Sequence, residues 1–287
     1  SGLSSTTGRP LGGAVKADVT VAFGFCKLGL VLPQAKPYVG RLVVADISIP
    51  NQVEESLPVR RELVDEAFCR RWLGIREAES YKGDFGHVAV LAGSPSMPGA
   101  AILAARGAMK AGAGRLSAAL PSAVRTPFIA QLPESMLIPV SDGENGCVAL
   151  ENIKALSEFA ADSWLIGPGM GRDPRTLEMI REFLPLLRTP AVLDADALFA
   201  VCGHLRLLKK ANAPLVITPH PGEMAKLLGV SVNDVQANRV AVAEGFAKQT
   251  NVVVVLKGAG TVIATPEGRI FVNETGNPGM ATGGSGD

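Results

Sequence analysis

The chain of 287 residues is long enough for one large α/β domain and part of a second. Hydrophobic residues make up 47% and charged residues 19%, with 32 glycines and 20 prolines, which excludes global disorder and is typical of α/β enzymes with short strands and many turns. The formal net charge is +1 without long runs of like charge, which argues against nucleic-acid and membrane partners and favours a small molecule.

Other features of the composition predict a cytoplasmic protein. The four cysteines are scattered without metal-ligand spacing, which predicts reduced thiols rather than a zinc site. The longest weakly polar stretch, residues 99–121, is interrupted by Arg106, Lys110 and Arg115, so the sequence predicts no membrane helix. No signal peptide pattern is present, and a start at Ser1 rather than Met leads us to expect that the chain is cut at this end.

The first eighty residues predict a domain fragment and a linker. Residues 17–23 and 41–49 are rich in β-branched residues and bounded by Gly or Pro, which predicts two strands, too few for a domain. Residues 51–80 are polar and rich in helix-forming residues, which predicts a linker with a helix. We therefore expect a domain fragment over residues 1–50, the linker over 51–80 and a second domain over 81–287.

From residue 86 onward the sequence has the regular pattern of a parallel α/β domain. Residues 87–93 predict a buried strand, and residues 98–112 predict an alanine-rich helix with Pro98 in its first turn. Further short apolar runs are separated by spans long enough for crossover helices: residues 115–120, 164–167, 191–194 and 215–218. We expect a mostly parallel sheet with helices on both faces. Three closely spaced runs predict hairpins at a sheet edge: residues 251–257, 261–265 and 269–273.

The glycine-rich segment 276–287 is the strongest candidate for chemistry. Gly283, Gly284 and Gly286 leave the backbone free to turn N–H groups toward an anion, and Asp287 could take a proton from a substrate hydroxyl. This layout suits phosphoryl transfer. Taken alone, the segment is equally consistent with a glycine-rich surface loop, so its interpretation depends on the rest of the sequence.

Seven segments of the second domain resemble, in the same order, the motifs of one enzyme family. They are YKGDFGH at 81–87, GS and PGAA within 93–101, GPGMG at 167–171, LDADAL at 193–198, TPHPGE at 218–223, KGAGT at 257–261 and NPGMATGGSGD at 277–287. The last contains the GxGD pattern of the ribokinase-like superfamily, and the set resembles its ADP-dependent NAD(P)H-hydrate dehydratases. The resemblance implies a ribokinase-like fold and the repair of hydrated NADH or NADPH with ADP, or ATP, and Mg²⁺.

The resemblance also implies roles for individual residues. Asp287 would be the catalytic base toward the hydroxyl at C6 of the hydrated nicotinamide ring, while Gly284 and Gly286 would hold the transferring phosphoryl group. Substrate contacts are implied for Ala101, Gly171, His220 and Asp287. Contacts with the AMP portion of the nucleotide are implied for Lys257, Gly258, Ala259, Gly260, Thr261 and Gly286. Glu223 would help to order magnesium.

Simpler structural roles stay open for several of these residues. A single histidine such as His220 is more often structural, but a position between two prolines after a strand end favours ligand binding. Residues 167–171 could serve only turn packing, and residues 257–261 only a hairpin turn. Asp194 and Asp196 could be polar residues at a strand end or carboxylates of the site, and the sequence does not decide between these roles.

The first fifty residues resemble the end of an NAD(P)H-hydrate epimerase domain, which is Rossmann-like and precedes the dehydratase in many bacteria. The similarity rests on SGL at 1–3, KAD at 16–18, KLG at 27–29 and the segment 40–50. It implies that Ser1 is a potassium ligand and that most of that domain lies upstream. Because the family continues past Asp287 into a helix that strengthens the anion site, we expect a C-terminally truncated dehydratase domain and assign the activity to the intact parent protein.

The implied reaction phosphorylates the ring hydroxyl of the S-epimer of the hydrated cofactor, after which the lone pair of the ring nitrogen expels phosphate. Hydroxide is a poor leaving group and phosphate a good one, so a kinase-like site can produce a dehydration. Two alternatives stay open. One is a ribokinase-like kinase of a vitamin precursor, and the other is a catalytically silent nucleotide-binding module. We expect a homo-oligomer, because members of the family often assemble.

Overall fold

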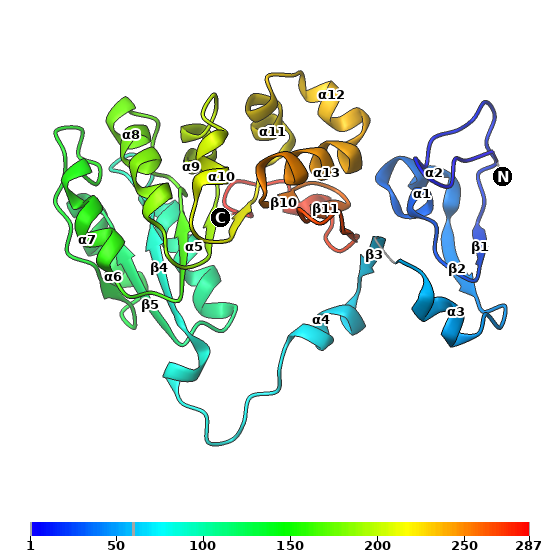
Figure 1. Ribbon diagram of the computed structural model, residues 1–287, viewed down its shortest axis with the longest axis horizontal. Coiled ribbons are helices and arrows are strands. Elements are labelled where there is room, and N and C mark those ends of the chain that lie inside the picture. The colour runs from blue at the N-terminus through cyan, green and yellow to red at the C-terminus, as the bar shows by residue number, and fades with distance from the viewer. Residues whose placement is uncertain (1, 59–60, 287) are drawn as a thin grey trace.

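The computed structural model describes residues 2–58 and 61–286, and two sheets organise this part of the chain. The smaller sheet pairs β1 (Val19–Phe23) with β2 (Arg41–Ala45) in parallel, and the short helices α1 (Leu28–Val31) and α2 (Lys36–Val39) lie between them in sequence. Both strands occur where the β-branched runs predict them. These elements form the blue group at one end of the molecule in Figure 1.

The segment that follows is more structured than a linker with one helix. It contains α3 (Asn51–Ser56), β3 (Arg61–Val64) and α4 (Glu66–Trp72). Strand β3 pairs in parallel with β12 (Ile270–Asn273), and Glu62 forms an ion pair with Arg269. The sequence does not predict β3, because an edge strand with charged residues owes its conformation mainly to its partner strand. The division of the chain at residues 50 and 81 remains a prediction.

Ten of the described strands form one large sheet, in the spatial order β3, β12, β11, β10, β9, β8, β7, β4, β5, β6. The remaining bounds are β4 (His87–Leu91), β5 (Arg115–Ala119), β6 (Met136–Leu137), β7 (Ser163–Ile166), β8 (Ala191–Leu193), β9 (Leu215–Ile217), β10 (Val253–Leu256) and β11 (Thr261–Ala264). Neighbouring strands are parallel, except that β11 runs antiparallel to β10 and β12. The predicted parallel sheet and the hairpin pairing of β10, β11 and β12 are thus confirmed. The predicted place of these hairpins at the edge of the sheet is wrong, because β3 pairs with β12 on its outer side. The sequence predicts neither β3 nor β6.

The order of the sheet reverses at β4. Strands β5 and β6 lie on one side of β4, and β7 to β10 follow one another on the other side. The helices are α5 (Pro98–Lys110), α6 (Ser122–Gln131), α7 (Ile153–Glu158), α8 (Pro174–Phe183), α9 (Asp196–Ala200), α10 (Arg206–Lys210), α11 (Pro221–Leu228), α12 (Val232–Ala237) and α13 (Arg239–Thr250). Helices α5 and α6 connect the strands on one side of β4, and α8 to α13 connect the strands on the other side. Because crossovers between parallel strands are right-handed, these two groups of helices cover opposite faces of the sheet. Ligands commonly bind beside such a reversal, at the carboxyl ends of the strands.

Apolar side chains on both faces of the sheet form the core. Leu91 on β4 and Ile166 on β7 are fully buried, and Trp164 packs edge-on against Phe183 with ring centroids 5.1 Å apart. Leu32 from the first part of the chain is only 6% exposed and belongs to the same buried cluster, so this part packs against the large sheet and its helices. In the described ranges, none of the helices has the length and apolar character to cross a membrane.

A buried histidine makes the stability of the sheet depend on pH. His87 on β4 is 8% exposed, and its Nε2 lies 2.8 Å from Oγ of Ser117 on β5. Burial, and secondly the charge of Arg115, lower the pKa of His87 below its ordinary value. As the pH drops below about 6.5, the unfolded chain takes up a proton on His87 before the folded protein does. The free energy of unfolding should therefore fall in this pH range.

We expect His87→Gln to flatten this pH dependence, because glutamine keeps a polar partner for Ser117 but does not titrate. Urea unfolding at pH values between about 7.5 and about 5 measures the effect. The matched control is His204→Gln, since His204 is exposed. A slope in His87→Gln equal to that of the unchanged protein would contradict the assignment.

Candidate active site

The loops that follow β4 and β7 interlock where the sheet order reverses. Gly93 donates its backbone N–H to the carbonyl oxygen of Pro168 at 2.8 Å. Gly169 has a φ of 65°, and a Cβ atom at this position would lie 2.7 Å from Cβ of Ala100. Glycine alone tolerates both this conformation and this close approach. The two motif segments therefore form one structure at the carboxyl edge of the sheet.

The two predicted substrate contacts in these loops differ in accessibility. Ala101 is fully buried in the first turn of α5, and its role as a substrate contact remains a prediction. Gly171 has a φ of 84° and open space where a Cβ atom would be. Its N–H donates to Asp196 Oδ2 at 2.8 Å, and Nε of Arg172 donates to Oδ1 of the same buried carboxylate at 2.9 Å. Asp196, which the sequence left undecided, thus fixes the Gly171 loop.

His220 begins α11 and caps it. Its Nδ1 accepts the backbone N–H groups of Gly222 at 3.0 Å and Glu223 at 3.3 Å, and the Glu223 carboxylate accepts the His220 N–H at 2.7 Å. This reciprocal arrangement is a capping box. Because Nδ1 accepts, the neutral ring carries its proton on Nε2. The His220 side chain is 57% exposed, so a ligand can approach the ring, whose Nε2 lies 3.6 Å from Oε1 of Glu223.

Glu223 is already engaged within the protein. One of its carboxylate oxygens accepts from the His220 backbone, and the other lies 3.6 Å from Nε2 of the same histidine. Among the residues that the structure describes, no group of three or more His, Cys, Asp or Glu side chains could hold a metal ion. A divalent cation at this edge would therefore depend on phosphate oxygens and water for most of its ligands. The magnesium role of Glu223 remains a prediction.

Arg239 at the start of α13 braces the loop 257–261. Its guanidinium donates to the carbonyl oxygens of Ala259 at 2.6 Å, Leu256 at 2.8 Å and Lys257 at 3.0 Å. Burial lowers the pKa of Arg239 below its ordinary value, as expected for a charge that is compensated largely by carbonyl oxygens. The sequence does not mark Arg239 as a site residue, because no local motif contains it and the carbonyl groups that it contacts belong to a different element.

Three polar side chains meet where neighbouring parallel strands end. Asp194 follows β8, Thr218 follows β9 and Lys257 follows β10. Oδ1 of Asp194 accepts the Thr218 hydroxyl at 2.6 Å and the Lys257 ammonium at 2.8 Å. Asp194 is only 5% exposed. This residue, also left undecided by the sequence, is therefore the ion-pair partner of a predicted nucleotide contact.

The glycine-rich segment approaches the same lysine. Gly284 has a φ of 82°, a conformation that favours glycine. A Cβ atom on Gly286 would lie 3.7 Å from Nζ of Lys257. In Figure 1 the chain after β12 turns back toward the middle of the molecule, which brings this segment to the carboxyl edge of the sheet. Two predicted site residues lie outside the described part of the chain: Ser1 and Asp287.

These features together suit a phosphate ligand. The edge offers the ammonium group of Lys257 and the exposed imidazole of His220. It also offers a glycine-rich segment, with Gly284 at positive φ, whose backbone N–H groups can bind an anion. The buried carboxylates of Asp194 and Asp196 are paired within the protein, so they position basic groups rather than present free negative charge. Such an arrangement can bind and transfer a phosphoryl group to a neighbouring hydroxyl.

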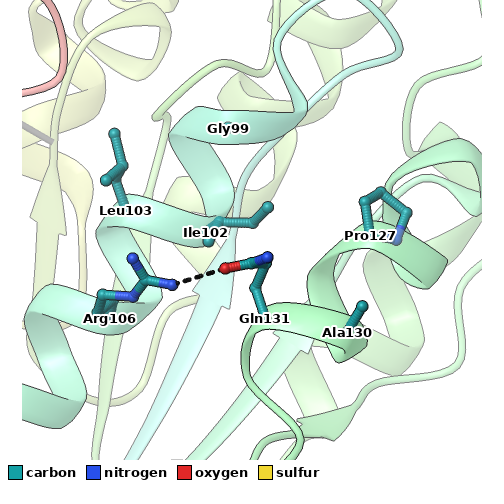
Figure 2. A pocket seen from close by; sticks show the side chains of 7 residues that line it. All are labelled: Gly99, Ile102, Leu103, Arg106, Pro127, Ala130 and Gln131. Carbon is teal, nitrogen blue, oxygen red and sulfur yellow. Dashed lines mark hydrogen bonds between the residues drawn. The ribbon is translucent and has the colours of Figure 1, made fainter.

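A separate hollow lies between α5 and α6. Figure 2 shows the residues that line it: Gly99, Ile102, Leu103, Arg106, Pro127, Ala130 and Gln131. Arg106 donates to the side chain of Gln131 at 3.0 Å. The lining is mostly apolar, and the buried Ala101 is not part of it. We therefore do not assign this hollow to the candidate site.

Comparisons relate this chain to known proteins. The profile of the NAD(P)H-hydrate dehydratase family matches residues 88–287. The bifunctional NAD(P)H-hydrate repair enzymes Nnr of Moorella thermoacetica and Thermofilum pendens are 44% and 38% identical to the chain, and each alignment covers 100% of this chain and 54% of the relative. The chain thus spans about half the length of the curated relatives that it matches.

Two solved structures are similar as well. The ADP/ATP-dependent NAD(P)H-hydrate dehydratase from Bacillus subtilis, co-crystallised with ATP and Mg²⁺, is 34% identical, with a TM-score of 0.66 over 80% of this chain and 77% of that chain. A ribokinase-like superfamily protein from Enterococcus faecalis is 26% identical, with a TM-score of 0.67 over 79% of this chain and 76% of that chain. The predicted ribokinase-like fold is thereby confirmed.

We expect Arg239→Met to loosen the loop 257–261 without unfolding the protein. Hydrogen bonds from a charged donor contribute about 1.5–3 kcal/mol each, and methionine fills space without replacing them. Amide hydrogen exchange in the loop should therefore accelerate by about tenfold or more, measured by mass spectrometry. Arg175→Met is the matched control, because Arg175 is exposed and pairs with Glu144. Unchanged exchange in Arg239→Met would show that other contacts hold the loop.

Proposed function

We propose that this chain, which belongs to the NAD(P)H-hydrate dehydratase family, carries the site that converts hydrated NADH or NADPH back to the intact cofactor. The observation that supports this most strongly is the meeting of Lys257, Asp194 and the glycine-rich segment at one edge of the sheet. A nucleotide phosphate bound there would face the loops that contain Gly171 and His220. Donor and acceptor of the phosphoryl group would thus share one crevice.

The proposed reaction has two steps. Asp287 takes the proton from the hydroxyl at C6 of the S-epimer, and the oxygen attacks the terminal phosphorus of ADP, so that AMP leaves. Backbone N–H groups near Gly284 and Gly286, with the Lys257 ammonium, stabilise the charge of the transferring group. The lone pair of the ring nitrogen then expels phosphate from C6, and loss of a proton from C5 restores the double bond.

Magnesium would act on the phosphate groups in this scheme. Mg²⁺ commonly keeps several water ligands and uses only one or two carboxylates together with substrate phosphates, which fits an edge whose buried carboxylates are already paired. Glu223 could contribute one oxygen. Bound there, the ion would neutralise phosphate charge. ADP and ATP share the groups that this site would contact, so either could serve as the donor.

We propose in addition that residues 1–50 are the end of an NAD(P)H-hydrate epimerase domain of the parent protein. The support is their resemblance to such domains and the similarity of the whole chain to bifunctional repair enzymes. In this proposal Ser1 contributes to a potassium site, and the epimerase supplies the S-epimer that the dehydratase consumes.

The first test measures recovery of the near-ultraviolet absorbance of reduced nicotinamide from hydrated NADH, with ADP and Mg²⁺ and the full-length protein. We expect recovery in the unchanged protein and a loss of about 100-fold or more in kcat for Asp287→Asn, because general-base catalysis contributes that much. Asp46→Asn is the control, since Asp46 accepts a hydrogen bond from the Ser48 backbone that asparagine can also accept.

The fate of phosphate separates this proposal from its main alternative. A dehydratase releases inorganic phosphate in the same amount as it restores cofactor. A phosphorylated product that retains its phosphate would instead support a kinase of a vitamin precursor. No turnover with either ADP or ATP would contradict the proposed function.

We expect His220→Asn to weaken binding of the hydrated cofactor while α11 stays intact. Asparagine is a good N-terminal cap but does not place a donor where the imidazole Nε2 lies. Loss of one hydrogen bond should raise KM for hydrated NADH by about tenfold and leave KM for ADP unchanged. Steady-state kinetics with each substrate varied in turn measures both values. An equal rise in both KM values would contradict a specific substrate contact.

A further inference from the structure

We propose that Asp194 is a positioning residue that holds the Lys257 ammonium where the transferring phosphoryl group of the nucleotide binds. This inference rests on the proposed function and extends it to a residue outside the predicted contacts. Strands β8, β9 and β10 are neighbours and parallel, so Asp194, Thr218 and Lys257 leave the sheet at the same edge.

The contacts of Asp194 are stronger than a surface role would require. Asp194 as a whole residue is 5% exposed, and its carboxylate accepts both the Thr218 hydroxyl at 2.6 Å and the Lys257 ammonium at 2.8 Å. A buried carboxylate without such partners would be costly. Replacing a buried ion pair by apolar residues is often neutral or stabilising, so this pair is weak evidence for stability alone. Its place at the candidate site favours a functional reason.

The Lys257 side chain is held by Asp194 and remains partly exposed to solvent. The Lys257 side chain is 29% exposed, unlike that of Asp194, which is 7% exposed. The glycine-rich segment lies close to the same ammonium group, since a Cβ atom on Gly286 would lie 3.7 Å from Nζ. The Lys257 backbone is fixed as well, because its N–H donates to Pro219 at 2.9 Å. Asp194 thus restricts a flexible side chain to one orientation, toward the glycine-rich segment.

The residue between Asp194 and Asp196 adopts an unfavourable backbone conformation. Ala195 has a φ of 49° and a ψ of −114°, which is rare for a residue other than glycine. On one side of it Asp194 contacts Lys257, and on the other side Asp196 contacts Gly171. Strain of this kind persists where surrounding contacts enforce it, and it concentrates at functional sites.

This arrangement predicts an effect on turnover more than on nucleotide affinity. With Asp194→Asn, Lys257 keeps its charge and can still reach a phosphate, but its orientation is no longer imposed. Transition-state stabilisation needs that orientation, whereas binding of the ground state needs it less. We expect kcat for dehydration to fall by about tenfold or more, while Kd for ADP changes by less than about threefold.

A double-mutant cycle with Lys257→Met tests whether Asp194 acts through the lysine. If it does, Asp194→Asn should cause no further loss of kcat in the Lys257→Met background. We expect kcat of the double variant to be somewhat higher than that of Lys257→Met alone. Lys257→Met leaves the buried Asp194 carboxylate without its charged partner, and Asp194→Asn removes that negative charge. Asp196→Asn is the matched control, an equally buried aspartate with other partners, and its effect should multiply with that of Lys257→Met.

Two results would overturn the inference. One is an Asp194→Asn variant with unchanged kcat, and the other is a loss of kcat that persists in full in the Lys257→Met background. Should Asp194→Asn not fold, Thr218→Val replaces it, because this change removes one of the two hydrogen bonds that orient the carboxylate. A smaller loss, of about threefold, is expected, and it should vanish in the Lys257→Met background.

A readout without turnover separates this inference from the proposed function. We expect Asp194→Asn to increase acylation of Lys257 by a small amine-reactive reagent several-fold, and ADP to protect the lysine, both measured by mass spectrometry. If the full-length protein does not restore hydrated NADH but shows both effects, the positioning role stands and the dehydratase proposal fails. Acylation that Asp194→Asn leaves unchanged would count against the positioning role.

Discussion

The parallel pairing of β4, β7, β8, β9 and β10 is the constraint on which the candidate site depends. Parallel strands end at the same edge of a sheet, so the residues that follow them meet however far apart they lie in the chain. Asp194 and Lys257 are 63 positions apart and form an ion pair of 2.8 Å. Strand β11 is antiparallel to both β10 and β12, so β12 runs in the same direction as β10 and ends at the same edge of the sheet. The glycine-rich segment therefore starts from the same edge.

The loop 257–261 is packed from two sides. Arg239 holds two of its carbonyl groups and that of Leu256 at the end of β10, and on another side a Cβ atom on Gly260 would lie 3.0 Å from Cδ of Pro33 in the first part of the chain. Arg9 in that part donates to the carbonyl of Ala237 at 2.7 Å, just before α13. The first part of the chain and the loop 257–261 are thus in direct contact, and the shape of the loop depends on both neighbours.

The same geometry is compatible with a kinase and with a lyase, and the difference lies in the substrate. A phosphoryl group on an ordinary alcohol stays in place, whereas one on a carbon next to an electron-rich ring nitrogen is expelled. In the proposed function, the protein therefore needs only to bind the hydrated ring beside the nucleotide and to stabilise the transferring group. The paired carboxylates fit this task, because they orient basic groups without adding free negative charge near phosphate.

The sequence by itself determined much of this protein. Apolar runs with glycine or proline at their ends predicted most strands of the large sheet close to their bounds, because a strand buried on both faces needs continuous apolar residues. The motif segments also indicated candidate loops, and the structure brings the loops after β4 and β7 together at the carboxyl edge of the sheet. Residues whose importance is local, such as His220 within its capping box, were visible in this way.

Only the tertiary structure decided the remaining features, because they depend on partners that are distant in the chain. Strand β3 is charged and takes its conformation from β12, so its own residues do not predict a strand. Arg239 lies in a helix without any motif, and its role comes from the carbonyl groups of a loop. Asp194 and Asp196 are identical residues two positions apart, and the strained Ala195 between them directs one to Lys257 and the other to Gly171.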